Sequence, residues 1–356
     1  MESERRRLQS ILRRIGLTQK EAEVYIAIAV RGSATVKELL ETLESVHQPQ
    51  LYNILSSLIR KGFIRASVGR PKVYAANDLA SLFDTRVHVI KNLKAEAVEL
   101  LDKLKAVEKE VEGEALVYLI RGYEGLEAAI LEVLGSAQVE VCAELPTRVL
   151  TEIIDAVENT LSRRVNMYLI VFPDVPEEVR ENLSRYATLK LRKNRLGNFL
   201  MVTSDTRVTV YARRRFYSPY KLPVPETEVY GFYITEKDLI WRLLNIFEGG
   251  WKTADEVLSW PLSPESYPKT FLEFGMALNE LEALLSKGLK PRVHVDGWYV
   301  KTREPVSVKG EVVRVERTVE VNNFTLDVGG EELAIGGFDS EVEDIEAYRV
   351  RIERVE

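Results

Sequence analysis

The chain has 356 residues, of which 46% are hydrophobic and 29% charged, a composition typical of a soluble globular protein with room for two or three domains. No apolar run approaches the roughly 20 residues needed to span a bilayer. The N-terminus lacks the apolar core of a signal peptide, so we expect a cytoplasmic protein with no membrane partner. The single cysteine, Cys142, excludes an internal disulfide, and the three histidines lie far apart, so we expect no metal site.

The charge is unevenly distributed along the chain. The formal net charge is −6, yet residues 1–72 contain 13 Lys or Arg against 7 Asp or Glu. The remainder must therefore carry a strongly acidic balance. A basic segment on an acidic body is typical of a phosphate-binding module joined to a module that does not bind DNA. An ordinary solvated surface with uneven charge is the alternative.

Residues 17–74 have the pattern of a winged helix-turn-helix, preceded by a short arginine-rich helix over residues 4–16. Thr18 with Glu21 and Thr35 with Glu38 are capping-box signatures for a first helix and for a second helix ending near Leu43. The apolar face of the first helix is predicted from three- and four-residue spacing to comprise Leu17, Val24, Tyr25, Ile28 and Ala29.

A third helix is predicted from about Pro49 to Arg60, with Gly62 directly after its end. Its inward stripe is Leu51, Ile54, Leu55 and Leu58. Residues 63–76 alternate apolar and polar positions around Val68-Gly69, which predicts a hairpin.

A winged helix-turn-helix enters a major groove with its third helix, so we expect double-stranded DNA as a partner. The candidate DNA-binding residues on this helix and on the hairpin are Gln48, Gln50, Tyr52, Asn53, Ser56, Arg65, Arg70 and Lys72. A winged helix used only for protein contacts is the alternative.

Residues 78–112 contain a heptad pattern that Gly113 closes. Its apolar positions are Ile90, Leu93, Ala97, Leu100, Leu104, Val107 and Val111. Phe83 and Arg86 continue the register upstream, and the arginine is a flaw in it. Such a stripe favours a coiled coil, and hence a homodimer through residues 83–111. A helix that packs on its own chain is the alternative.

The rest of the chain predicts two further domains. Residues 113–248 alternate strands and helices, including a single helix over 146–164 and a hairpin around Ser204-Asp205, which predicts an α/β layered domain. Residues 249–356 predict one helix over 266–288 and then short strands of a small β-barrel or sandwich. Turn signals in this last part are Asp296-Gly297, Lys309-Gly310, Gly329-Gly330 and Gly336-Gly337. The expected fold class is therefore α+β multidomain, with boundaries at 1–77, 78–112, 113–248 and 249–356.

This order of modules resembles the TrmB family of archaeal sugar-responsive transcription regulators. The resemblance lies in LTQKEAEVYIAIAVRGSATVKELLE, LYNILSSLIRKGFI and VGRPKVYAA, and in VSVKGEVVRVE, LAIGGF and VEDIEAYRVRI of the last third. It implies a phospholipase-D-like middle domain. Enzymes of that fold need a His-x-Lys-x4-Asp motif, and the matching stretch has Asn198 and Leu200 before Asp205. Because an amide cannot replace the nucleophilic imidazole, we expect no phosphodiesterase activity, no enzyme function and no cofactor.

The resemblance also implies a sugar effector, of the maltose or trehalose α-glucoside type, bound by the C-terminal domain. The residues that match the family's pocket are Asn322, Gly337, Phe338 and Glu343. Each is equally an ordinary turn or surface residue. Two departures from the family's pattern are His47-Gln48-Pro49-Gln50 at the start of the third helix and the bulky or charged Phe338 and Glu341 near the pocket.

We therefore expect a DNA-binding regulator whose operator affinity a sugar controls. The alternative is an architectural, chromatin-like DNA-binding protein that responds to no effector.

Overall fold

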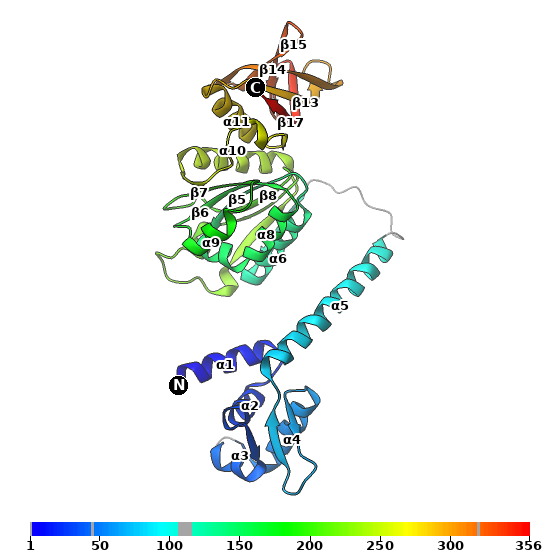
Figure 1. Cartoon of the computed structure of the whole chain (residues 1–356), viewed down its shortest axis with the longest axis vertical. Helices are drawn as coiled ribbons and strands as arrows, with labels where there is room; N and C mark the ends of the chain where they lie inside the picture. Colours follow the sequence, from blue (N-terminus) through cyan, green and yellow to red (C-terminus); the bar gives the residue numbers. More distant parts are fainter. Residues whose placement is uncertain (1, 44–45, 106–115, 319–320) are drawn as a thin grey trace. The chain divides into compact units, whose positions relative to one another are not determined.

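The computed structural model describes residues 2–43, 46–105, 116–318 and 321–356 (Figure 1). The chain divides into two compact units, residues 1–112 and 113–356, which are described separately here. We call them unit 1 and unit 2. Both mix helices and strands, as the sequence predicts.

Unit 1 is a winged helix-turn-helix followed by a long helix. Its elements are α1 (Glu2–Arg14), α2 (Gln19–Arg31), β1 (Ser33–Thr35), α3 (Val36–Thr42), α4 (Gln48–Arg60), β2 (Ile64–Ala66), β3 (Val73–Ala76) and α5 (Leu79–Lys105). The hairpin β2–β3 gains a third strand that the sequence reading missed, because β1 pairs with β3 to give the order β1-β3-β2.

The helix boundaries of unit 1 follow their caps. Both capping boxes are present, with Thr18 Oγ1 accepting from the Glu21 amide and Thr35 Oγ1 from the Glu38 amide. Gly62 has a φ of +77°, which only glycine adopts readily, and it stops α4 before the wing. The predicted apolar face of α2 is wrong at Ala29, which is exposed, because Ala22 and Ile26 supply the inward contacts instead.

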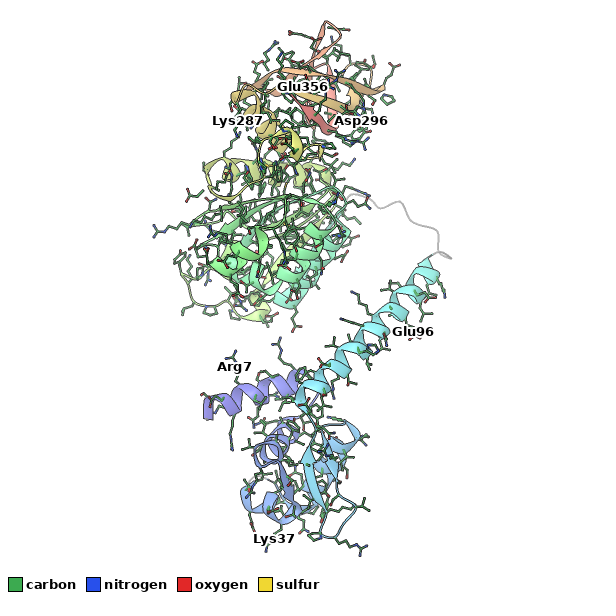
Figure 2. The ribbon with its side chains drawn as sticks, in the orientation of Figure 1. Arg7, Lys37, Glu96, Lys287, Asp296 and Glu356 are labelled. Atoms are coloured by element: carbon green, nitrogen blue, oxygen red, sulfur yellow. The ribbon has the colours of Figure 1, made fainter. Side chains whose placement is uncertain are left out.

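The helix α5 carries an exposed apolar stripe. Ile90, Leu93, Leu100 and Leu104 are 53–66% exposed. Glu96, labelled on the same helix in Figure 2, is also exposed. Val107, Val111 and Gly113 lie outside the described residues. Arg86 is no flaw in this stripe. It faces the winged domain, where its guanidinium lies over the Phe63 ring at 4.7 Å and donates to the carbonyls of Ile15 and Lys61.

Unit 2 begins with an eight-stranded sheet in the order β11-β7-β6-β5-β8-β9-β10-β4. Its strands are β4 (Val117–Arg121), β5 (Glu140–Pro146), β6 (Asn166–Phe172), β7 (Leu189–Lys193), β8 (Leu200–Ser204), β9 (Val208–Ala212), β10 (Tyr230–Ile234) and β11 (Asp255–Leu258). Strands β5, β6 and β7 are parallel. β6 is buried along its whole length, which explains its apolar run, whereas β7 is buried only at Leu189 and Leu191.

Helices cover both faces of this sheet (Figure 1). One face carries α6 (Gly122–Ser136), α7 (Thr147–Glu152), α8 (Ile154–Ser162) and α9 (Glu177–Leu183). The other carries α10 (Lys237–Thr253), and short 3-10 turns occur at Arg214–Tyr217, Glu226–Glu228 and Pro264–Ser266. The single helix predicted over 146–164 is wrong, because the chain leaves helical geometry at Ile153, where φ is −110° and ψ 15°.

The helix predicted over 266–288 is also shorter than expected. Lys269–Phe271 forms strand β12, and α11 (Phe274–Ser286) starts only where the Glu273 side chain accepts from the Met276 amide as an N-cap. Thus the first part of the stretch pairs with a strand of the C-terminal sheet.

The C-terminal sheet closes into a small barrel. Strands β13 (Pro291–Tyr299), β14 (Pro305–Arg317), β15 (Asn322–Val328), β16 (Glu331–Gly336) and β17 (Ile345–Val355) pair in sequence, and β17 pairs with both β13 and β16. Two predicted turns are wrong. Gly297 lies inside β13 and Gly310 inside β14. Glycine suits both positions because a neighbouring strand approaches closely: an added Cβ would come within 2.2 Å of the Glu346 carbonyl oxygen at Gly297, and within 2.1 Å of the Asp327 carbonyl oxygen at Gly310. The turn at Gly329-Gly330 is confirmed by φ values of +68° and +98°.

One apolar core runs from the α10 face of the large sheet through α10 and α11 into the barrel. A buried carboxylate on α11 connects these layers. Glu280 accepts from Trp260 Nε1 at 2.7 Å, from the Tyr267 hydroxyl at 2.6 Å and from Lys190 of β7. The barrel and the sheet are therefore tied by polar as well as apolar contacts.

A second buried carboxyl group makes the same connection from β5. Glu140 Oε1 accepts from the backbone amides of Leu272 and Glu273, just before α11, while its Oε2 has no partner. Burial, with a contribution from the neighbouring Glu273 carboxyl, raises the pKa of Glu140 to about 8. Burial raises the pKa of Glu273 to about 7. This junction therefore favours protonated carboxyl groups.

Candidate DNA interface and effector site

The helix α4 has one apolar and one polar face. Its predicted inward stripe is buried, with Leu51, Ile54, Leu55 and Leu58 all at most 8% exposed. On the opposite side the candidate base-contacting residues Gln48, Tyr52, Asn53 and Ser56 are exposed, and Gln50 is half-buried. The face that these five residues form is called the reading face below. All five residues lie on one helix, so the helical repeat of the sequence was enough to predict this face.

The wing hairpin places its three cations at or near its tip. Arg65 lies on β2, Arg70 and Lys72 lie between β2 and β3, and all three side chains are exposed. Val68 at the tip is also fully exposed. The hairpin therefore offers positive charge from the element next to α4.

A partly buried ion pair joins the end of α4 to α2. Lys61 Nζ donates to Glu21 Oε2 at 2.7 Å, and Ser57 Oγ donates to Glu21 Oε1 at 2.6 Å. Burial alone would raise the pKa of Glu21, but the hydrogen bonds from Lys61, Ser57 and the Thr18 amide outweigh it and lower this pKa to about 2. The same glutamate thus caps α2 and holds the C-terminal half of the reading helix.

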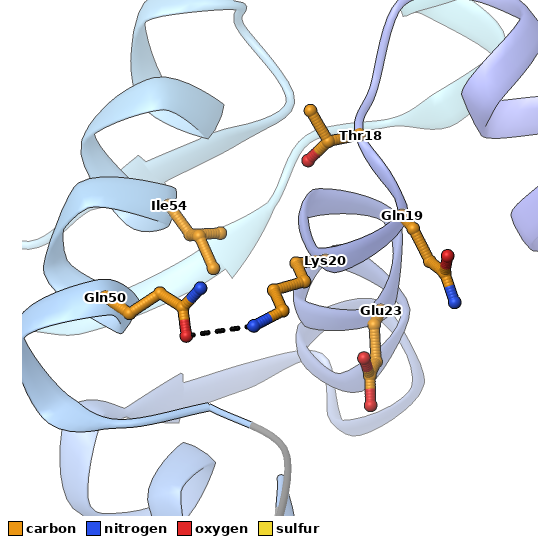
Figure 3. Close-up of a pocket in the computed structure, with 6 residues that line it drawn as sticks. All are labelled: Thr18, Gln19, Lys20, Glu23, Gln50 and Ile54. Atoms are coloured by element: carbon orange, nitrogen blue, oxygen red, sulfur yellow. Dashed lines mark hydrogen bonds between the residues drawn. The ribbon is translucent and has the colours of Figure 1, made fainter.

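A hollow of about 520 Å³ lies between α2 and α4 (Figure 3). It is lined by Thr18, Gln19, Lys20, Glu23, Gln50 and Ile54. Lys20 Nζ donates to Gln50 Oε1 at 3.1 Å, which brings a cation to the edge of the reading face. The sequence reading missed Lys20, because only the packing of α2 against α4 brings it there.

The four candidate effector residues gather at one end of the barrel. Asn323 of β15 is paired with Gly336 of β16, so Asn322 and Gly337 lie at adjoining strand ends. The Glu343 side chain packs against Gly336, where an added Cβ would come within 2.8 Å of its Cδ. Phe338 follows directly, 39% exposed, so the four residues share one end of the sheet.

Within this end of the barrel Glu343 is unusual. Its residue exposure is only 7%, and none of the described residues donates a hydrogen bond to its carboxylate, yet its oxygens are not among the fully buried unpaired side-chain atoms. The carboxylate oxygens are therefore within reach of solvent, and equally of the hydroxyl groups of a ligand. Glu341, two residues away, is exposed to solvent.

Two helices add aromatic rings that the sequence did not place here. Trp241 of α10 lies 5.9 Å from the Phe338 ring, centroid to centroid. The Phe274 ring of α11 packs against Gly337, where a Cβ would come within 2.8 Å of it. Trp298 and Tyr299 are partly exposed on β13, and Trp298 pairs with Tyr348 at 4.8 Å rather than with Phe338. The site thus combines amide, carboxylate and aromatic groups, the set that binds a polyhydroxylated ring.

The stretch that matches the phospholipase D motif has no nucleophile. Asn198 is exposed, and its backbone N–H donates to Glu144 Oε1 at 2.5 Å. Leu200 is fully buried. Asp205 sits in the β8–β9 turn with φ +51°, and its carboxylate accepts from the backbone amides of Gln138, Val139 and Glu140. The aspartate therefore organises the backbone before β5.

Across residues 2–43, 46–105, 116–318 and 321–356, no group of three or more His, Cys, Asp or Glu side chains is placed to hold a metal ion. None of the helices in these ranges is long and apolar enough to cross a membrane.

Comparison with known families identifies the class of protein as a DNA-binding transcription regulator. Sugar-specific transcriptional regulator TrmB matches residues 12–80. Transcriptional regulator TrmB, EBD N-terminal subdomain, matches residues 116–258, and TrmB/TrmBL1, EBD C-terminal subdomain, matches residues 266–355. All three describe parts of one family and together match most of the chain. The chain therefore belongs to the TrmB family of transcription regulators.

Two relatives from Pyrococcus furiosus are similar to the chain. The HTH-type sugar sensing transcriptional regulator TrmBL1 is 24% identical over 342 residues, covering 94% of this chain and 95% of the relative. The HTH-type transcriptional regulator TrmBL2 is 25% identical over 203 residues, covering 53% of this chain and 76% of the relative.

Solved structures give weaker similarities. A structure of TrmBL2, described as an archaeal chromatin protein with a novel mode of DNA binding, matches with 22% identity and a TM-score of 0.35, covering 70% of this chain and 99% of that one. Nuc, a phospholipase D family member from Salmonella typhimurium, matches with 13% identity and a TM-score of 0.33, covering 41% of this chain and 100% of that one. At such TM-scores neither similarity bears on function.

Proposed function

We propose that this protein is a homodimeric regulator that binds operator DNA through the reading face and the wing, and that a sugar bound at the β15–β16 end of the barrel changes its operator affinity. The effector part rests on the mostly buried Glu343, whose carboxylate accepts from none of the described residues and lies at the same end of the barrel as the Trp241–Phe338 ring pair. A maltose- or trehalose-type α-glucoside would supply hydroxyl donors to it.

Support for DNA binding comes from the chemistry of the exposed residues. Amide groups such as those of Asn53 and Gln48 can form paired hydrogen bonds with adenine edges in a major groove. Arg65, Arg70 and Lys72 are cations suited to phosphates, and Lys20 adds one more beside α4. Since α4 begins with His47-Gln48-Pro49-Gln50 and no basic side chain, we expect the wing to supply most of the salt-dependent affinity.

Support for a homodimer comes from α5. Its apolar stripe follows the 3,4 spacing of a coiled coil and is exposed over Ile90–Leu104. A matching helix from a second copy would cover it and would place two reading faces for a two-fold operator.

The proposed function is tested by thermal shift and operator binding with a sugar series. A sugar at 100 times its Kd should raise the free energy of unfolding of the unit that binds it by about 2.7 kcal/mol. We expect one α-glucoside to give this shift and to change operator affinity. Glu343→Gln should weaken binding of that sugar at least about tenfold, because a charge-assisted hydrogen bond contributes about 1.5–3 kcal/mol. The exposed Glu341→Gln is the matched control and should leave sugar binding unchanged.

The alternative, an architectural DNA-binding protein without an effector, is favoured by the concentration of positive charge in residues 1–72. It predicts DNA binding with a steep salt dependence, little sequence preference and the same affinity with and without every sugar tested. That set of results would reject the effector-controlled regulator.

A further inference from the structure

Strand β4 is the edge strand of the large sheet in the described part of the chain. It pairs antiparallel with β10 on one side, from Val117 opposite Ile234 to Arg121 opposite Tyr230, and ends the strand order on the other. An edge strand exposes a row of unpaired N–H and C=O groups, which is a template for another strand.

The hydrogen bonds at the two ends of β4 show which residues point outward. The Thr235 amide donates to the Leu116 carbonyl at 2.9 Å, and the Gly122 amide donates to the Val229 carbonyl at 2.9 Å. Because backbone groups in an antiparallel ladder alternate in direction, even-numbered residues of β4 bond toward β10. The N–H and C=O groups of Val117, Leu119 and Arg121 therefore point to the free edge.

The side chains of this edge are apolar and accessible. Val117 is 47% exposed, and Tyr118 and Leu119 are each 52% exposed. No charged residue interrupts Leu116–Ile120. Natural edge strands usually carry a charge, a proline or a bulge that prevents further pairing, and β4 has none of these within that stretch.

The opposite edge of the same sheet is protected in the usual way. Strand β11 is four residues long, begins with the exposed Asp255 and Glu256, and has a register shift between Glu256 and Leu258. One edge is therefore closed to pairing while the other remains open, which argues against treating β4 as an ordinary exposed surface.

We propose that β4 pairs antiparallel with β4 of a second copy of this chain across a two-fold axis, joining two eight-stranded sheets into one. The geometry favours an axis through Tyr118. This register places Val117, which points outward, opposite the partner's Leu119, so that the two residues form a hydrogen-bonded pair. It also sets Leu116 opposite the partner's Ile120 and keeps Arg121 away from the partner's Arg121, a like-charge contact that would be unfavourable.

We choose a second copy of the chain as the partner of β4 because the strand is complementary to itself. The stretch Leu116–Ile120 carries no charge and therefore meets its own copy without charge repulsion. A two-fold contact uses the same patch on both subunits. Only residues 106–116 separate β4 from α5, whose exposed apolar stripe is also proposed to pair with a second copy. The two surfaces are thus nearly continuous in the chain. The β4 contact goes beyond the proposed function, because α5 pairing and operator binding can both hold without it.

The test is disulfide cross-linking of the full chain. Cys142 is buried and is the only native cysteine, so a new surface cysteine reports alone. Tyr118→Cys would face its own copy in a non-hydrogen-bonded pair, where Cα atoms lie about 4.5 Å apart, within the range that a disulfide spans. We expect mild oxidation to convert most of this variant to a covalent dimer. Tyr220→Cys is the matched control, since Tyr220 is a 58% exposed tyrosine outside β4 in the same unit.

Each outcome bears on the proposal. Equal cross-linking of Tyr118→Cys and Tyr220→Cys would overturn it, because that pattern is random collision. Stronger cross-linking of Leu119→Cys than of Tyr118→Cys would support the pairing but move the axis to residue 119. Adding Leu119→Lys to Tyr118→Cys should reduce cross-linking about tenfold while circular dichroism stays unchanged. A chain that binds its operator as a dimer but does not cross-link through β4 would reject this inference and leave the proposed function standing.

Discussion

Unit 1 and unit 2 each bury a glutamate where two elements meet, and the two carboxyl groups are held in opposite protonation states. Glu21 in unit 1 accepts from Lys61, Ser57 and the Thr18 amide, and its pKa falls to about 2. Glu140 in unit 2 accepts from two backbone amides, but its complete burial, with a further contribution from the Glu273 carboxyl, raises its pKa to about 8. Burial acts in the direction of a higher pKa on both groups. It prevails at Glu140, whereas the hydrogen bonds from Lys61, Ser57 and Thr18 outweigh it at Glu21.

The two candidate sites differ in a related way. The reading face belongs to one helix, held by a charged contact to α2. The effector end of the barrel is assembled from β15, β16, the loop after β16, α10 and α11. A site on one element tolerates changes elsewhere in its unit, whereas a site built from five segments depends on the junction that Glu140 helps to form.

The largest expected effect is on the pH dependence of unit 2. The folded pKa of Glu140 lies above the ordinary value of 4.5, so the folded state binds more protons between about pH 4.5 and pH 8. Stability is therefore present in full below this window and falls as pH rises through it, by on the order of 5 kcal/mol for a pKa raised from 4.5 to about 8. Thermal unfolding measured from pH 5 to pH 8.5 checks this. Glu140→Gln should flatten the dependence, and the exposed Glu181→Gln should not.

A smaller effect of opposite sign is expected in unit 1. The folded pKa of Glu21 is lowered, so its contribution is present above about pH 4.5 and is lost as pH falls toward 2. At neutral pH, Glu21→Gln should lower the stability of unit 1 by about 2 kcal/mol, because Lys61 loses a charged acceptor. Denaturant unfolding of this variant beside the exposed Glu41→Gln tests the contrast. Equal stability of the two variants would show that the Lys61 contact contributes nothing.

The next largest effects are losses of operator affinity in unit 1, where substitutions can distinguish contacts to bases from contacts to phosphates. Asn53→Ala should cost about 1–3 kcal/mol of operator affinity and relax the base preference, with the salt slope unchanged. Arg70→Ala should weaken binding to all sequences and lower the slope of log K against log salt by about 1. Fluorescence anisotropy at several salt concentrations distinguishes the two. If Asn53→Ala changed only the salt slope, the reading face would be misassigned.

The smallest expected signal is phosphodiester hydrolysis by unit 2. Asn198 supplies no imidazole and the Asp205 carboxylate already accepts from three backbone amides, so we expect no turnover of a model phosphodiester above the uncatalysed rate. Pure protein that hydrolyses the substrate, and loses that activity on Asn198→Ala, would contradict the expectation.

Sequence periodicity predicted what depends on neighbours a few positions apart. The caps at Thr18 and Thr35, the buried stripe of α4 and the exposed stripe of α5 are all of this kind. Features that depend on contacts between distant segments were not predicted correctly. Gly297 was predicted in a turn but lies in a strand. The contact of Lys20 with α4 and the position of Trp241 beside Phe338 were not predicted at all. For the effector end, only the resemblance to a family indicated where to look.

Arg86 has a mechanical consequence. By lying over Phe63 and donating to the carbonyls of Ile15 and Lys61, it fastens the first turns of α5 to the winged domain, so the helix and the head turn as one rigid arm. A small rotation or slide between two such arms would then be converted into a change in the distance between two reading faces. DNA half-sites are fixed one helical turn or a multiple of it apart. A dimer built on this joint would therefore select operators by their spacing as well as by their bases.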